Sequence, residues 1–115
     1  MHEVGIMESA LTVVQRHAAE RKARRVDRIV LRIGTLAGVE PEALRFAFDV
    51  VTRGTVAEGA VLAIENAPAR VYCPACEREF TGEADSFIFT CPDCHALCGE
   101  VRSGRELELS RIEMS

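Results

Sequence analysis

Two cysteine pairs constrain this chain more than any other feature of its sequence. Fourteen residues separate the second cysteine of one pair from the first cysteine of the next. Two residues within each pair let both thiolates turn toward one ion, and a short hairpin fits the spacer. Four thiolates in a tetrahedron suit Zn(II), whereas a redox dithiol or disulfides are the alternative. The predicted zinc ligands are Cys73, Cys76, Cys91 and Cys94.

This ligand set is closed, which predicts a structural site. Four protein ligands leave no coordination position for a substrate, so a zinc enzyme is disfavoured. An insertion of about 35 residues cannot build its own core, so metal binding should supply its folding energy. His95 follows the last cysteine and is either an exposed loop residue or an alternative ligand. Cys98 is the odd cysteine, interpreted as a free thiol or a spare ligand.

Periodicity divides the rest of the chain into a few regular elements. Apolar residues recur at helical spacing in two segments and alternate in two others, whereas the cysteine-bearing segment shows no helical periodicity. We expect helices over 4–20 and 41–53 and strands over 26–34, 61–66 and from 106 onward. The fold class expected is α+β, with two helices on a small, mainly antiparallel three-stranded sheet and an inserted four-cysteine zinc-ribbon-like domain. The expected domains are 1–69 plus 106–115 and an inserted zinc-binding domain at 70–105.

Cysteine usage and hydropathy bear on the compartment. Five cysteines, four of them in Cys-x-x-Cys pairs, indicate metal binding in a reducing environment. No run approaches the roughly 18 apolar residues of a membrane span. The N-terminus lacks a basic segment followed by an apolar one, so no signal peptide is expected. The sequence therefore predicts a cytoplasmic protein with no membrane partner.

Charge is segregated along the chain. The net charge is −4, yet the segment 16–32 holds seven Arg or Lys against two acidic residues, a net of +5. This segment is interpreted as a solvated helix end with an exposed strand face, and a docking patch for an acidic partner is the alternative. The zinc segment 70–105 has four Arg against six acidic residues. A zinc ribbon that binds nucleic-acid phosphates should have a basic zinc segment, so nucleic acid is not an expected partner.

The chain begins Met1-His2-Glu3, which offers an unusual set of nitrogen donors. The Met1 amine, the His2 amide nitrogen and the His2 imidazole can form fused chelate rings, and Glu3 can add its amide nitrogen or carboxylate. Nitrogen-rich square-planar or tetragonal sites suit Ni(II) or Cu(II). Binding requires deprotonated amine and imidazole, so affinity should fall as pH drops. Taken alone, however, an early histidine is more often a solvated side chain.

Together these features resemble the HypA/HybF family of hydrogenase maturation factors over essentially the full length. The resemblance rests on the opening tripeptide, the strand 26–34 with the loop that follows it, the two Cys pairs, and the closing segment Gly104-Arg-Glu-Leu107. It implies a nickel metallochaperone rather than an enzyme, with a zinc domain inserted in a nickel-binding domain. His2 is implied as the essential nickel ligand, with Glu3 contributing and the Met1 amine completing the set.

The resemblance also implies partners. Family members deliver nickel to the large subunit of nickel–iron hydrogenase together with the GTPase HypB, and some also serve urease. Many relatives have glycine where this chain has His95, and Cys98 lies outside the family pattern. A zinc-ribbon nucleic-acid-binding or adaptor protein is the alternative function. The sequence shows no Gly-x-x-x-x-Gly-Lys phosphate loop, so any nucleotide hydrolysis must come from a partner.

Overall fold

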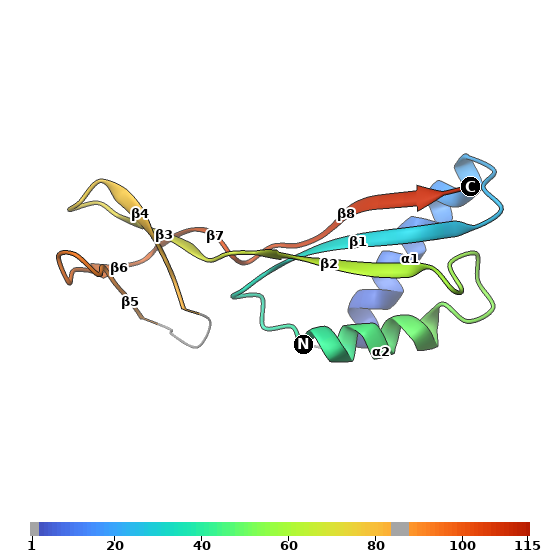
Figure 1. Cartoon of the computed structure of the whole chain (residues 1–115), viewed down its shortest axis with the longest axis horizontal. Coiled ribbons are helices and arrows are strands. Elements are labelled where there is room, and N and C mark those ends of the chain that lie inside the picture. Colours follow the sequence, from blue (N-terminus) through green and yellow to red (C-terminus); the bar gives the residue numbers. More distant parts are fainter. Residues whose placement is uncertain (1–2, 84–87) are drawn as a thin grey trace. The chain divides into compact units, whose positions relative to one another are not determined.

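The computed structural model describes residues 3–83 and 88–115, in two helices and several short sheets (Figure 1). The expected α+β class is confirmed: two helices accompany a three-stranded sheet in the order β2-β1-β8, and the cysteines lie in the segment between β2 and β8. The helices and the strands of this sheet are α1 (Glu3–Glu20), β1 (Val26–Gly34), α2 (Pro41–Val51), β2 (Val61–Ala67) and β8 (Leu107–Met114). Neither helix is long and apolar enough to cross a membrane.

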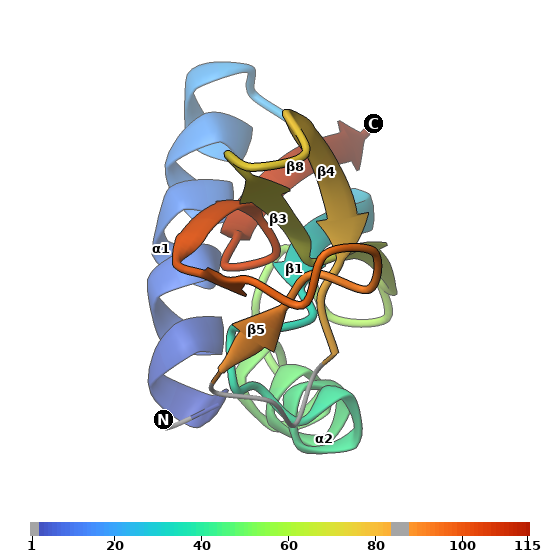
Figure 2. The ribbon, with the colours of Figure 1, turned by 90° about the vertical axis from the view of Figure 1, so that its left-hand side faces the viewer.

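The cysteine-bearing segment forms two further sheets. One has the order β4-β3-β7 and the other pairs β5 with β6, and all the pairings within them are antiparallel. Their strands are β3 (Arg70–Cys73), β4 (Arg78–Thr81), β5 (Phe89–Thr90), β6 (Leu97–Cys98) and β7 (Glu100–Ser103). Figure 2 shows β3, β4 and β5 of these sheets in a second view.

Contacts divide the chain into two compact units. The first contains 1–31, 38–65 and 108–115, and the second contains 32–37 and 66–107. The second unit therefore includes the end of β1 and the turn after it, in addition to the cysteine-bearing segment. The domain bounds expected from the sequence, with a break at 70 and at 105, stay a prediction.

The core of the first unit forms between the two helices and the sheet. The helices begin and end at recognisable signals: Glu40 caps α2 by accepting from the backbone N–H of Glu42 (3.2 Å), and Pro41 occupies its first turn. The apolar faces of α1 and α2 pack against each other, and β1 contributes four buried residues, three of them consecutive. The buried apolar residues of this unit, among those described, are Met7, Val14, Ala18, Val26, Ile29, Val30, Leu31, Leu44, Ala47, Phe48, Ala57 and Leu62.

In the second unit, three stretches of backbone run unusually close together. A Cβ on Gly34 would lie 2.0 Å from the carbonyl oxygen of Gly104, and a Cβ on Gly104 would lie 2.6 Å from the Cα of Ala69. Hydrogen bonds fix this approach: Gly34 donates to the carbonyl of Glu106 (2.7 Å), and Leu36 donates to that of Gly104 (2.6 Å). Any larger residue at Gly34 or Gly104 would separate these backbone segments, so the close approach requires glycine at both positions.

Candidate metal centre

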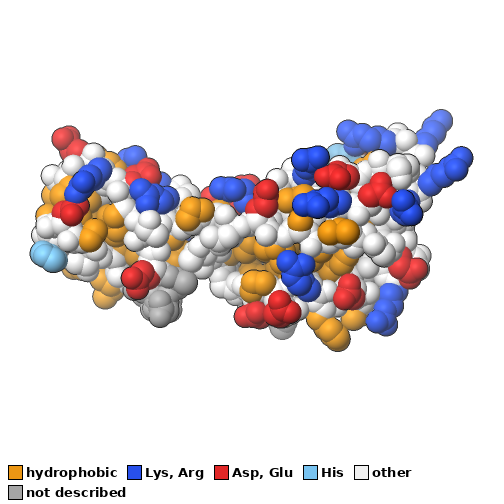
Figure 3. Space-filling view, in the orientation of Figure 1, with side chains coloured by type: hydrophobic (Ala, Val, Ile, Leu, Met, Phe, Trp, Pro, Cys, Tyr) orange, Lys and Arg blue, Asp and Glu red, His pale blue; other side chains and the backbone are white. Residues whose placement is uncertain are grey.

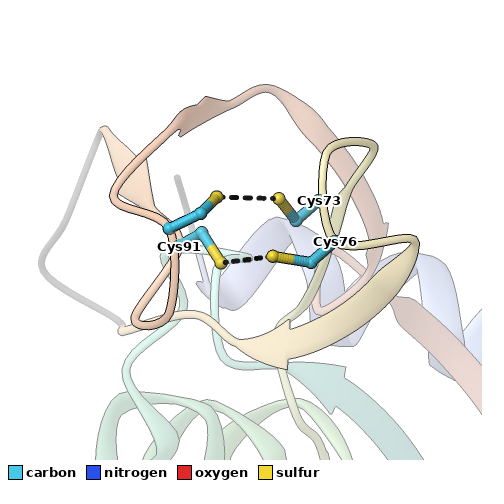
Figure 4. Close-up of side chains that lie close together, drawn as sticks. Cys73, Cys76 and Cys91 are labelled. Atoms are coloured by element: carbon cyan, nitrogen blue, oxygen red, sulfur yellow. Dashed lines mark hydrogen bonds between the residues drawn. The ribbon is translucent and has the colours of Figure 1, made fainter.

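The four paired cysteines converge on one point of the second unit. Their sulfurs all lie within 4.8 Å of one another. The Sγ atoms of Cys73 and Cys94 are 3.6 Å apart, and those of Cys76 and Cys91 are 3.8 Å apart (Figure 4). Each sulfur pair therefore joins one cysteine of the first motif to one of the second. The structure thus brings together all four residues that the spacing selected.

These separations fit a tetrahedral ion. Zinc–sulfur bonds of about 2.3 Å in a tetrahedron place the sulfurs about 3.8 Å from one another. A disulfide would need about 2.05 Å, and all five cysteines of the chain are free thiols here. The geometry and the soft sulfur donors therefore fit Zn(II) and argue against the disulfide alternative.

The local backbone supports this arrangement at both turns. The residue after each second cysteine has a left-handed conformation, with φ of 54° at Glu77 and 62° at His95. His95 also donates its backbone N–H to the carbonyl of Cys91 (2.9 Å), which closes the second turn. Left-handed residues reverse the chain tightly, so both thiolates of a pair turn to the same side.

Backbone donors favour the thiolate form of one cysteine in each turn. The backbone N–H of Cys76 hydrogen-bonds to the sulfur of Cys73 and lowers its pKa below the ordinary thiol value. The backbone N–H of Cys94 does the same for Cys91 and lowers its pKa. These two sulfurs are also the most buried of the four, so their charge is stabilised where water is scarce.

Crowding of sulfur has the opposite effect on Cys76. Hydrogen bonds with the thiols of Cys94 and Cys91 favour its protonated form, and together with burial they raise its pKa to about 12. Four thiolates this close repel one another strongly, so without a cation the group must keep protons. A divalent cation at the centre would replace those protons. Protons and metal therefore compete for the sulfurs, and metal affinity at such a site decreases as the pH decreases.

A small apolar core and one ion pair hold the two turns together. Val71 and three cysteines form the buried cluster, and Phe80, Phe89 and Val101 pack against it. The sequence places Phe87 in the same hairpin as Phe80 and Phe89, but Phe87 lies outside the described residues. Arg78 after the first turn forms a salt bridge with Asp93 inside the second.

The two unassigned neighbours of the site behave differently. Cys98 is buried, its Sγ donates to the carbonyl of Ala96 (3.4 Å), and it packs within the same cluster as Cys73 and Cys91. It is not among the four sulfurs that surround one point. His95 is exposed and is likewise outside that group. In this structure neither residue occupies a ligand position.

At the N-terminal site, Met1 and His2 lie outside the described residues, and Glu3 begins α1. The backbone N–H of Glu40 donates to the Glu3 carboxylate (3.3 Å). Glu3 therefore contacts the residue that caps α2, as the two helices pack together. No sequence signal points directly to this contact, although Glu40 immediately precedes the helix predicted over 41–53.

The whole chain is similar to proteins of one family. A sequence profile described as "Hydrogenase/urease nickel incorporation, metallochaperone, hypA" matches residues 1–114. Hydrogenase maturation factor HypA of Chloroflexus aurantiacus is 43% identical over 113 residues, covering 98% of both chains. The HypA protein of a Picosynechococcus species is 40% identical over 114 residues, covering 99% of both.

Solved structures agree with the fold. The solution structure of the nickel metallochaperone HypA from Helicobacter pylori matches with a TM-score of 0.67 and 25% identity, covering 99% of this chain and 97% of that one. A second solution structure, of a HypA protein, matches with a TM-score of 0.73 over the whole of this chain and 97% of the other.

Proposed function

Because the chain belongs to the HypA family of nickel metallochaperones for hydrogenase maturation, we propose that Met1, His2 and Glu3 bind its nickel and that its four paired cysteines bind a structural zinc. The full-length match to this family carries the proposal and disfavours the alternative of a nucleic-acid-binding ribbon or adaptor. The acidic charge of the cysteine-bearing segment argues in the same direction.

The cysteine site is suited to zinc more than to transferable nickel. Its four sulfurs have the separations of a tetrahedron, whereas Ni(II) in an exchangeable site favours nitrogen and oxygen donors in tetragonal geometry. Four ligands also close the coordination shell. Zinc there would supply the charge that Cys73, Cys76, Cys91 and Cys94 need to lie so close together.

The N-terminal site is suited to an ion that leaves again. The Met1 amine and the two nitrogens of His2 would hold three positions, leaving a fourth open or weakly held. The Glu3 carboxylate already accepts from the backbone N–H of Glu40, so it is better placed to position the N-terminus than to bind the ion. We therefore infer that Glu3 acts through this positioning contact and that its amide nitrogen holds the fourth position only weakly, so that an incoming ligand can displace it.

Transfer by ligand exchange needs no catalytic residue in this chain. An incoming ligand enters the open position before the N-terminal ligands leave, so the chain acts as a carrier and not as an enzyme. The partners we infer are a HypB-type GTPase and the large subunit of nickel–iron hydrogenase, with urease maturation proteins as a further client. Cysteine pairs that ligate a metal are typical of reducing compartments, so we propose that this work takes place in the cytoplasm.

Metal titration of tag-free protein tests the nickel site. His2→Ala should abolish nickel binding and leave one zinc per chain, because the imidazole is lost and the cysteines are untouched. His17→Ala is the matched control, since His17 lies on α1 and contacts Arg21 (3.2 Å). Nickel binding that survives His2→Ala, or that His17→Ala removes equally, would contradict the assignment.

A second variant tests the amine. One residue added before Met1 turns the terminal amine into an amide and leaves every side chain in place. Nickel affinity should weaken sharply while zinc stays at one per chain. Unchanged nickel affinity would place the ion elsewhere.

A further inference from the structure

A dense group of cations surrounds the end of α1 in the first unit. Its side chains are exposed and come from the end of α1 with the turn after it, from β1, which follows directly, and from β8, which is far away in the sequence. Figure 3 shows blue side chains gathered where α1 ends and β8 finishes. We call this group the basic surface, and it consists of Arg21, Lys22, Arg24, Arg25, Arg28 and Arg111.

The backbone fixes the positions of these cations. The helix ends in a Schellman turn, in which Lys22 donates to the carbonyl of Ala19 (3.1 Å) and Ala23 to that of Ala18 (2.9 Å). The turn is then held against the end of β8, because the backbone N–H groups of residues 24 and 25 both donate to the carbonyl of Ser115 (2.8 and 3.1 Å). The cations are thus displayed on ordered backbone.

One of these cations occupies a position that favours glycine. Lys22 has φ of 53°, in the left-handed region that such a helix end usually fills with glycine. A non-glycine residue there carries a cost in backbone conformation that glycine would avoid. A lysine at this cost suggests that its charge has a use.

Few carboxylates neutralise the basic surface. Arg25 pairs with Asp27 (2.9 Å), while Arg28 (3.9 Å) and Arg111 (3.1 Å) share Glu113. Lys22 and Arg24 form no salt bridge with any residue that the structure describes. Counting Glu20 as well, six cations face three carboxylates, which leaves a net charge of +3.

Helix electrostatics accounts for only part of this group. Cations in the last turn of a helix interact favourably with its dipole, but the effect fades within that turn. It can explain Arg21 and Lys22. The four arginines beyond the helix, two of them on strands, gain nothing from the dipole. Their grouping therefore calls for a different explanation.

We propose that the basic surface docks a short acidic segment of a protein with which this chain works. The inference rests on the proposed function, in which nickel passes to another protein. Five of the six cations are arginines, whose planar guanidinium groups bind carboxylates in pairs of hydrogen bonds. The remainder of the chain carries eight cations and 15 acidic residues, a net of −7. A long polyanion such as nucleic acid would meet that negative charge, whereas a short acidic segment would not.

Fluorescence anisotropy with a labelled oligoglutamate peptide tests the proposal. The peptide should bind the full-length zinc-loaded protein at about 50 mM salt and bind more weakly as salt rises. Lys22→Glu/Arg24→Glu should weaken binding by about tenfold or more, because two unpaired cations of the surface become anions. Arg53→Glu/Arg105→Glu is the matched control, since it changes the net charge equally at two exposed arginines outside the basic surface. It should change the affinity by less than about twofold.

Three outcomes would overturn the inference. These are no peptide binding, equal weakening in both double variants, or a single-stranded DNA of the same charge binding as tightly as the peptide. Zinc content and nickel titration of Lys22→Glu/Arg24→Glu should match those of the wild type. Failure of docking is thereby distinguished from failure of the nickel site, which His2→Ala reports separately.

Discussion

Cys98 shows how one residue can lie beside a metal centre without belonging to it. Its side chain is 6% exposed and packs with Cys73 and Cys91, yet its sulfur donates to the carbonyl of Ala96. Burial raises the pKa of the Cys98 thiol, which keeps it protonated. A buried protonated thiol behaves as a small apolar side chain.

We therefore expect Cys98→Ala to keep one zinc per chain. The free energy of unfolding should fall by about 1 kcal/mol, because a small buried side chain is truncated. Metal analysis together with thermal unfolding measures both quantities. Cys73→Ala is the comparison, and it should lose the zinc. Loss of zinc in Cys98→Ala would instead make Cys98 a ligand.

A second single-residue effect should appear as a pH dependence at Glu106. Its own backbone N–H and that of Gly104, which donates to Glu106 Oε1 (2.6 Å), favour the carboxylate and lower the Glu106 pKa. Because the folded-state pKa is the lower one, this stabilisation is complete above the unfolded value of about 4.3. It is lost as pH falls through the folded value.

Glu106→Gln should therefore be less stable than wild type near neutral pH, and the difference should shrink on acidification below about pH 4.3. Urea unfolding of both proteins at a series of pH values measures this. Glu108→Gln, at an exposed neighbouring position, should show no such trend. A difference that is constant with pH would mean that the carboxylate charge is not what stabilises this turn.

Among the elements, β1 ends at a residue that has no room for a side chain. A Cβ at Gly34 would lie 2.0 Å from the backbone oxygen of Gly104, and backbone cannot move aside as a flexible side chain can. Gly34→Ala should therefore destabilise the protein by at least about 3 kcal/mol. Gly99→Ala is the matched control, because a Cβ there meets nothing within 4 Å. Similar unfolding midpoints for the two variants would contradict the close approach.

Much of the element pattern could be predicted from the sequence, because burial on one face imposes a period. The alternation of Ile29, Leu31 and Ile33 located β1 at its observed bounds, and Pro41 located the start of α2. The helix expected to reach residue 53 ends at Val51, and Thr52 caps it by donating its backbone N–H (3.1 Å) and its hydroxyl (2.7 Å) to the carbonyl of Phe48. Helix ends depend on such local hydrogen bonds, which periodicity does not report.

The short strands and the long-range contacts could not be predicted, because the interactions that produce them leave no periodic pattern in the sequence. The strands β3 to β7 are only two to four residues long and surround sulfur atoms, so no apolar repeat marks them. The contact between Glu3 and Glu40 joins residues 37 apart in the sequence. The approach of Gly34 to Gly104 likewise depends on tertiary structure. The four cysteines were found because metal ligation imposes a spacing of its own, independent of secondary structure.

At the scale of the whole molecule, the two units differ in what stabilises them. The first unit buries large apolar side chains from both helices and the sheet, Met7, Ile29 and Leu44 among them. In the second unit, by contrast, three cysteines and Val71 make up the buried cluster around the metal centre. So small an apolar core cannot offset the entropy of ordering the chain, and metal binding must supply the difference.

Removing zinc should therefore unfold one unit selectively. On treatment with a chelator and a reductant, backbone amides of β3, β4 and β7 should lose protection from hydrogen exchange, because the sulfurs that hold their turns together would then repel one another. Amides of α1 and α2 should stay protected, since their core contains no cysteine. Exchange followed by mass spectrometry resolves these segments, and adding zinc back should restore protection, which separates metal loss from irreversible damage. If the helices lost protection together with β3, the two units would unfold as one cooperative structure, and the zinc would stabilise α1 and α2 as well as its own turns.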